Sequence, residues 1–479
     1  MTSVTASQSA GRSEIARLLS VILLSRIVIN TAFRMSYAFV PEFSRGLGID
    51  LPAMGALIST RSVAGMLAPV FGSLSDRFGR RPVMMGALVL LITCATLSYL
   101  APSFLFFAVG FVGLGLAKVI FEPSGSAFLG DRVPYARRGL VLGMSELGWA
   151  SGGLIGVPIA ARAISLWGWQ SPYALVALGG ALALIWAAIA LPRTDSVIRA
   201  QRIDSRSASS ATASQLDTRA TAFASASQPD TTVATSIIAP QLDNRTTATF
   251  ASAPTSSVTP AQRIDTPSAF STVPAPTSGV VPAQRVDTRA AFSAIARHRS
   301  AVLMLCVSAA FVAGGELISV SYASWLTQVF RLDVIALGGI VATFALAEVC
   351  GEVLSMVAVD HFGKKRALFV GYCATTLLYF VLPALGASLP VAVAALFLYY
   401  ICFEFTIVSV FPLVSELAPE ARGTMLSLTT LAHSLGRTIG GLGGATLFLL
   451  GGFGANGVAA GLAVGAATLL FTVGVRERH

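Results

Sequence analysis

The chain has 479 residues, of which 54% are hydrophobic and only 12% are charged, and its mean hydropathy is +0.74. This composition excludes an ordinary soluble domain and indicates a protein that crosses the membrane many times. The net charge of +10 does not indicate nucleic-acid binding, because the basic residues lie in loops beside apolar segments and form no single basic face.

Twelve apolar segments are each long enough to cross a hydrocarbon core of about 30 Å, which takes about twenty residues of helix. The segment before the first of them shows no cleavable-signal pattern, so the first helix is expected to act as an uncleaved insertion signal. We predict an all-α polytopic membrane protein with two six-helix bundles, whose helices cover residues 16–40, 52–75, 82–101, 103–129, 139–165, 170–191, 300–328, 334–359, 367–387, 389–414, 422–447 and 453–474.

Residues 192–298 separate the two sets of helices and are rich in Ala, Ser, Thr and Pro, with no apolar face to bury. This composition predicts a disordered linker on the cytoplasmic side. A unit such as Gln201-Arg-Ile-Asp204 recurs imperfectly along it, but a folded repeat array would need a periodic hydrophobic core. The predicted domains are therefore an N-terminal bundle at 1–191, the linker at 192–298 and a C-terminal bundle at 299–479.

The stretch from Gly72 to Pro82 places three arginines between two apolar segments. Because arginine is costly inside hydrocarbon, this stretch predicts a tight loop at a membrane face. Gly79 tolerates a sharp turn, and Asp76 can pair with a guanidinium group or cap the next helix. The loop resembles the signature between helices 2 and 3 of the major facilitator superfamily, Gly-x-Leu-[Ala/Ser]-Asp-Arg-x-Gly-Arg-[Arg/Lys], through Gly72, Leu74, Ser75, Asp76, Arg77, Gly79, Arg80 and Arg81.

The two apolar halves repeat each other. From Asp76 to Gly139 is 63 residues, and from Asp360 to Gly423 is also 63 residues. The second copy reads Asp-His-Phe-Gly-Lys-Lys-Arg and has His361 where the first copy has arginine. The resemblance implies that the loop residues gate alternating access, with the second copy a weaker candidate. The predicted gating residues are Gly72, Asp76, Arg77, Gly79, Arg80, Arg81, Asp360, Gly363 and Lys364.

Small residues recur at matched positions further along each half. Gly152 and Gly156 follow Gly139 by 13 and 17 residues, and Gly436 and Gly440 follow Gly423 by the same intervals. This spacing predicts close helix packing. Antiporters of the superfamily carry a Gly/Pro-rich signature on the fifth helix, but here the order of the glycines differs, and packing alone explains the pattern.

Basic residues outside the linker gather on one side of the predicted helices, whereas the other side has only Arg45 and Arg331, with Arg162 as a third candidate. The richer side is expected to be cytoplasmic, so both termini should lie in the cytoplasm. The chain is expected to cross the cell membrane, plasma or inner, repeatedly.

Titratable residues inside the predicted helices each cost about 3 kcal/mol against lipid, so they must face a wet cavity, pair with each other or be neutral. They occur on the first, second, fourth and fifth helices of each half, which are expected to surround a central path. The predicted substrate and proton pathway comprises Arg26, Arg34, Arg61, Lys118, Glu122, Glu146, Glu316, Glu348, Glu352, Glu404, His433 and Arg437.

The two halves differ in the sign of these charges, because the first has mostly bases and the second mostly acids. Glu348 and Glu352 stand four residues apart with the same sign, so one is expected to hold a proton, as proton coupling requires. Glu404, Glu316 and Glu348 are the leading coupling candidates. The alternative is that these charges only brace the halves through ion pairs. The bases of the first half favour an anionic or zwitterionic substrate.

No nucleotide-binding loop, nucleophile–base motif, or metal-ligand cluster occurs, and the five cysteines have no zinc spacing. We therefore expect no enzyme activity, cofactor or metal. The predicted function is secondary transport by alternating access, with proton-coupled export of a small organic molecule first. Proton-coupled or facilitated uptake of a polar solute, and a sensor or scaffold that moves nothing, are the alternatives. The expected partners are the substrate, protons and the lipid bilayer, with the protein acting as a monomer.

Overall fold

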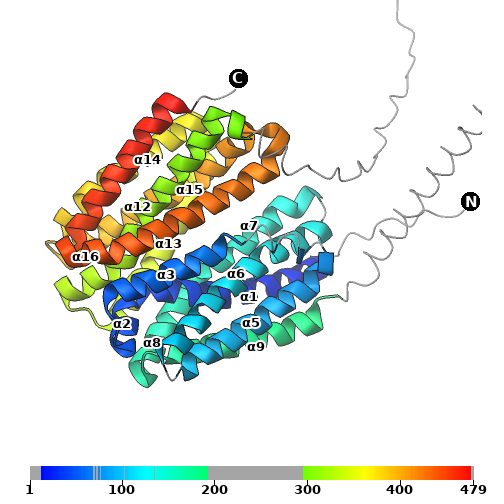
Figure 1. Cartoon of the computed structure of the whole chain (residues 1–479). Helices are drawn as coiled ribbons and strands as arrows, with labels where there is room; N and C mark the ends of the chain where they lie inside the picture. Colours follow the sequence, from blue (N-terminus) through cyan, green and yellow to red (C-terminus); the bar gives the residue numbers. More distant parts are fainter. Residues whose placement is uncertain are drawn as a thin grey trace, which may run out of the picture. The chain divides into compact units, whose positions relative to one another are not determined.

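The computed structural model describes residues 12–67, 71, 74–75, 77–101, 103–133, 135–192 and 295–475. In these residues helices are the only regular secondary structure, as predicted, and they belong to one compact unit (Figure 1). Gly72 and Asp76 of the predicted gate, and nearly all of the predicted linker, lie outside the described residues. The three domain boundaries remain predictions.

The first half, residues 12–192, begins at the blue end of the colour scale in Figure 1. Its helices are α1 (Arg12–Ala38), α2 (Val40–Leu47), α3 (Leu51–Gly65), α5 (Arg80–Leu100), α6 (Phe104–Arg132), α7 (Tyr135–Ser151), a π-helical turn (Gly152–Gly156), α8 (Val157–Trp167) and α9 (Ser171–Ala190).

The second half, residues 295–475, ends in red in Figure 1. Its helices are α12 (Arg299–Phe330), α13 (Val334–Phe362), α14 (Lys364–Val381), a 3₁₀ turn (Leu382–Leu385), α15 (Leu389–Leu417), a second 3₁₀ turn (Pro419–Ala421) and α16 (Arg422–Gly474).

Ten of the described helices are long and apolar enough to cross a membrane. The predicted number was twelve, and two features account for the difference. The regular part of α3 has 15 residues and ends at Gly65, where the amides of Met66 and Leu67 bond to carbonyls three residues back. Helix α16 has 53 residues but bends at Gly451 and Gly452, between the two helices predicted there.

Helix α3 of the first half and helix α13 of the second start with the same capping interaction. The Asp50 carboxylate accepts a hydrogen bond from the amide of Ala53 (2.9 Å), and the Asp333 carboxylate accepts one from the amide of Ala336 (2.7 Å). A side-chain acceptor at this position satisfies one of the amides that have no partner at a helix start. The internal repeat therefore includes the aspartate that caps the start of this helix in each half.

Hydrogen bonds show which helix ends lie together. The indole of Trp186 donates to Ser20 Oγ (3.1 Å), which brings the end of α9 beside the start of α1. Ser300 Oγ donates to the carbonyl of Gly474 (3.4 Å), which brings the start of α12 beside the end of α16. We call this side the terminal end, and the opposite side, where α3 begins and α16 bends, the far end.

The two halves meet closely at the far end through small residues. A Cβ at Gly55 of α3 would lie 2.8 Å from the Cβ of Ala445 and 2.8 Å from the carbonyl oxygen of Gly441, both on α16. A Cβ at Gly338 of α13 would lie 2.5 Å from the Cβ of Ala161 on α8. Only glycine permits such an approach of two helices.

The predicted packing glycines lie against the first helix of their own half. A side chain at Gly152 or Gly156 would collide with Asn30 or Thr31 of α1, and the π-helical turn between these glycines fits the same surface. Gly436 and Gly440 of α16 approach α12 in the same way, against backbone atoms of Ala309 and Ala313.

Candidate functional site: a charged cavity between the halves

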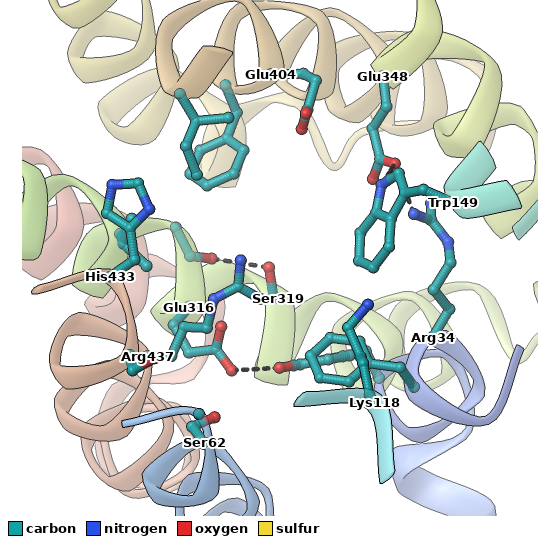
Figure 2. A pocket seen from close by; sticks show the side chains of 18 of the residues that line it. Arg34, Ser62, Lys118, Trp149, Glu316, Ser319, Glu348, Glu404, His433 and Arg437 are labelled. Carbon is teal, nitrogen blue, oxygen red and sulfur yellow. Dashed lines mark hydrogen bonds and ion pairs between the residues drawn. The ribbon is translucent and has the colours of Figure 1, made fainter. Parts of the chain in front are cut away.

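A cavity of about 520 Å³ lies between the two halves. Its walls come from α1, α3, α6 and α7 of the first half and from α12, α13, α15 and α16 of the second, and Figure 2 shows the side chains that surround it. None of its described lining residues belongs to α5, α9 or α14. The lining helices are those that the charges in the sequence single out.

The structure gathers nearly all of the predicted pathway residues around this one cavity. Arg26 is the exception, since it lies behind the wall and contacts Glu146. The pathway residues that line the cavity are Arg34, Arg61, Lys118, Glu122, Glu146, Glu316, Glu348, Glu352, Glu404, His433 and Arg437.

Two bases of the first half are already paired within that half. Arg26 Nη1 lies 2.6 Å from Glu146 Oε1, and Lys118 Nζ lies 2.5 Å from Glu122 Oε1 and 2.5 Å from Asn30 Oδ1. The expectation of a basic first-half wall was therefore wrong for these residues, because carboxylates on the same helices or on the neighbouring helix neutralise them. The four-residue spacing of Lys118 and Glu122 in the sequence already indicates their pairing, whereas the pairing of Arg26 with Glu146 follows only from the structure.

The third base reaches across to the second half. Arg34 Nη1 of α1 lies 2.6 Å from Glu348 Oε2 of α13, and the indole of Trp149 donates to the same oxygen at 2.9 Å (Figure 2). The Arg34 guanidinium carbon also lies 4.7 Å from the Trp149 ring centroid. Both charged side chains are less than a tenth exposed. This cluster joins α1, α7 and α13 across the cavity.

A second polar link between the halves involves Glu316 of α12. The hydroxyl of Tyr37 on α1 donates to Glu316 Oε1 at 2.8 Å, as the dashed line at Glu316 in Figure 2 marks. Tyr37 and Glu316 are both buried. The two links tie the same face of α1 to two helices of the opposite half.

Arg61 is a buried cation held mainly by aromatic rings. It is 3% exposed, and its guanidinium carbon lies 4.0 Å from the ring centroid of Phe33 and 4.8 Å from that of Phe111. Its Nη1 donates to Ser36 Oγ, while Nε and Nη2 have no hydrogen-bond partner in the described part of the chain. Rings offer such a cation partial electrostatic compensation where no carboxylate lies within 4 Å.

Two glutamates on the second-half wall stand apart from these pairs. Neither Glu352 of α13 nor Glu404 of α15 has a hydrogen bond or ion pair to another described residue, and both are partly exposed. Figure 2 shows the Glu404 carboxylate pointing into the cavity with no dashed line to it. His433 of α16 lines the same cavity and is 9% exposed, with no partner for its Nε2.

Aromatic side chains fill the wall between the charges, and the sequence did not single them out. On α15 the lining residues Tyr400, Phe403, Ile407 and Phe411 recur at helical spacing on either side of Glu404. Tyr37 and Trp149 were also missed, although each stands three residues after a predicted pathway residue and so shares its helix face. That spacing is the signal that could have found them.

The predicted gate loops form matching contacts at the terminal end. Arg80 Nε lies 3.3 Å from Asp131 Oδ2 at the end of α6, and Lys364 pairs with Glu416 at the end of α15. Gly79 and Gly363, which precede these bases, both have a positive φ, 96° and 84°. Only glycine adopts that backbone easily, which explains the conserved turn within the repeat.

The next basic residue of each loop holds the last helix of its own half. Arg81 Nη2 donates to the carbonyl of Ala188 near the end of α9 (3.0 Å), and Lys365 Nζ donates to the carbonyl of Val475 after α16 (2.6 Å). Cations are favourable at helix C-termini, where carbonyls have no partner in the helix. Arg77 lies beside the ring of Phe78, and Asp360 has no hydrogen bond or ion pair to another described residue.

Two repeated six-helix halves around a central charged cavity define a secondary transporter fold. The family model of the Major Facilitator Superfamily matches residues 22–441 and 301–479. The chain belongs to this superfamily, and its family and fold indicate a transporter and not an enzyme.

Similarity to individual proteins is more limited. The uncharacterized MFS-type transporter YwfA of Bacillus subtilis is 31% identical over 121 residues, which cover 25% of this chain and 29% of YwfA. The multidrug transporter QDR2 of Candida glabrata is 31% identical over 140 residues, which cover 28% of this chain and 23% of QDR2. The chain thus spans less than a third of the length of these relatives.

The fold itself is shared over nearly the whole chain. The crystal structure of a D-xylose–proton symporter superposes with a TM-score of 0.68 over 97% of this chain and 98% of the symporter. The two sequences are 14% identical, so this similarity establishes the fold and leaves the substrate open.

Proposed function

We propose that the protein is a proton-coupled exporter of small organic molecules that works by alternating access. The observation that carries this proposal is the second-half wall, where Glu352 and Glu404 face the cavity with no hydrogen bond or ion pair to another described residue, while their neighbour Glu348 is held by Arg34 from the opposite half. Acids without a counter-ion in a confined cavity are suited to bind and release protons, because a proton relieves their mutual repulsion.

The link between Arg34 and Glu348 supplies the conformational part of the proposal. A charge pair that joins the halves breaks or forms when the halves rotate, so protonation of the acidic wall and the conformation become linked. Of the three leading coupling candidates, Glu348 and Glu316 are engaged by Arg34 and Tyr37, which leaves Glu404 as the first choice.

The small-residue contacts at the far end and the exposure of lining residues near the terminal end support access to the cavity from the terminal end. Glu146 has a side chain that is 53% exposed, and Phe411 is 41% exposed. We propose that this end is cytoplasmic, as the distribution of basic residues predicts. Export is favoured over uptake by the similarity to a multidrug transporter.

The test is transport by the purified protein in proteoliposomes with an imposed pH gradient and a library of organic compounds. We expect at least one compound to move protons with it. Glu404→Gln should abolish accumulation against a gradient while substrate exchange continues at a saturating substrate concentration, because exchange needs no net proton movement. Absence of flux with every compound would favour a sensor, and accumulation by the Glu404→Gln protein would exclude Glu404 as the coupling group.

A further inference from the structure

Some of the charged side chains around the cavity form ion pairs and others do not. The sign of those that do not points to a class of substrate. In the first half, Lys118 and Glu122 neutralise each other, as do Arg26 and Glu146. Of the two remaining bases, Arg34 is paired with Glu348, and Arg61 is buried against aromatic rings. The partly exposed lining charges with no ion pair to another described residue therefore belong to the second half, and they are two carboxylates, Glu352 and Glu404, and one base, Arg437.

The two carboxylates, on Glu352 and Glu404, are both reachable from the cavity. Each residue lines it and is partly exposed. Arg61 does not offset them for a ligand, because its free nitrogens are inaccessible behind the rings that hold it. Two reachable carboxylates therefore face one partly exposed base, Arg437, whose guanidinium carbon lies 6.0 Å from the Phe33 ring centroid, and this balance attracts positive charge to the cavity.

The wall beside Glu404 suits an apolar body attached to that positive charge. Tyr400 stands one helical turn before Glu404, and its ring stacks on Phe344 with the centroids 4.8 Å apart. Phe403 stacks on Phe311 in the same way at 4.9 Å. Rings held by other rings present fixed faces, which bind apolar and cationic groups with little loss of side-chain freedom.

His433 gives an independent sign that the cavity is built to hold a ligand. Its side chain is more than nine-tenths buried, it lines the same cavity, and its Nε2 has no hydrogen-bond partner among the described residues. The edge of the Phe411 ring faces its imidazole, with the centroids 6.1 Å apart. A buried polar atom without a partner is unfavourable, so a ligand that satisfies it gains affinity.

We infer that the substrate is a monovalent organic cation with an aromatic body, whose charge lies against Glu404 and Glu352 and whose rings lie against the aromatic wall of α15. This inference rests on the proposed transport function and specifies its substrate class. It reverses the anionic or zwitterionic preference that the sequence indicated, because the pairing of Arg26 and Lys118 removes the basis for that preference.

The test compares two ions of the same shape and opposite charge, tetraphenylphosphonium and tetraphenylborate. Equilibrium binding to the full-length protein in detergent, corrected for empty micelles, should be at least about tenfold tighter for the cation. Glu404→Gln should weaken binding of the cation by about tenfold or more. Glu42→Gln is the matched control, since this glutamate lies outside the cavity and pairs with Arg45.

A second probe tests the role of His433. Ethidium is an aromatic cation with amino groups, whereas tetraphenylphosphonium has no hydrogen-bonding group. His433→Phe keeps a ring of similar shape, so it should weaken ethidium binding several-fold and leave tetraphenylphosphonium binding unchanged. Equal loss for both probes would mean that His433 serves only in packing.

The outcomes separate this inference from the proposed function. Tighter binding of tetraphenylborate, or cation binding that Glu404→Gln does not change, would overturn the cationic class even if proton flux were found with another compound. Cation binding that depends on Glu404, in a protein that moves no protons, would support the class and remove proton coupling.

Discussion

The two halves of this protein are alike at their ends and different in the middle. At the terminal end, Arg80 with Asp131 in the first half matches Lys364 with Glu416 in the second. At the cavity, the first half holds Arg26 and Lys118 in internal pairs, whereas the second presents Glu352 and Glu404 with no hydrogen bond or ion pair to another described residue. The comparison indicates that the contacts that hold a six-helix bundle together were kept in both copies, while the residues that face the cavity diverged.

The difference also locates the polar connections between the halves. Arg34 and Tyr37, one turn apart on α1, reach Glu348 and Glu316 of the second half. The structure describes no comparable base of the second half paired with an acid of the first. The first half thus supplies the donors and the second half the acceptors, and variants on either side should have unequal effects.

The largest expected effect comes from removing the donor of the buried pair between the halves. Arg34→Ala leaves the Glu348 carboxylate buried without its counter-ion, which should lower the free energy of unfolding by about 3–5 kcal/mol. Chemical denaturation in detergent measures this. Arg17→Ala, at an exposed position on the same helix, is the control and should change the value by less than about 0.5 kcal/mol.

A double variant sharpens the interpretation. Glu348→Gln in the Arg34→Ala background removes the buried carboxylate that has lost its counter-ion, and it should recover part of the lost stability. Wild-type stability of Arg34→Ala alone would show that the pair contributes nothing to holding the halves together.

A smaller effect, on rate, is expected at the predicted gate. Asp76→Asn keeps the size of the side chain and removes a charge-assisted hydrogen bond acceptor, so transport should slow by about tenfold with normal membrane insertion. Asp360→Asn should have less effect, because Asp360 is exposed and forms no hydrogen bond or ion pair to another described residue. Equal rates in both variants would contradict a gate that resides mainly in the first half.

The repeated ion pairs at the terminal end should have small and equal effects. Asp131 and Glu416 have side chains that are 58% and 51% exposed. Asp131→Asn and Glu416→Gln should each cost about 1 kcal/mol or less, and the cost should shrink in high salt. Thermal unfolding at two salt concentrations is the measurement, and a markedly larger loss from one variant would mean that the two pairs are not equivalent.

No effect on transport is expected from the linker. Replacing residues 195–294 by a shorter flexible segment should leave the rate unchanged, because every contact between the halves described above lies outside this range. Ile295, at the end of the predicted linker, is 2% exposed and is kept. The matched measurement is transport by the shortened protein in proteoliposomes. Lost transport in a shortened protein that inserts and folds normally would give the linker a part in the cycle.

The fold was largely predictable because a membrane sets the length of its helices. The predicted breaks around Gly451 and at the loop after Phe78 agree with the structure to within a few residues. The short helix α2 was missed, since its eight residues are fewer than a membrane span requires.

The candidate site was predictable in its members and, except for Lys118 and Glu122 four residues apart on one helix, unpredictable in its pairs. Charge in an apolar helix is costly wherever it occurs, so Glu404 and Arg61 stood out without any structure. Arg34 and Glu348 are 314 residues apart, and their contact depends on how two bundles are rotated against each other. Aromatic residues such as Tyr400 look the same in sequence whether they face lipid or a cavity.

The glycine contacts of Gly55 with Gly441 and Ala445 have a thermodynamic consequence. Among the described residues no hydrogen bond or ion pair joins α3 to α16, so separating these helices would mainly wet apolar surface. Hydration of apolar surface raises the heat capacity. If transport separates α3 from α16 at these glycine contacts, the equilibrium between the separated and the packed forms should have a curved dependence on temperature.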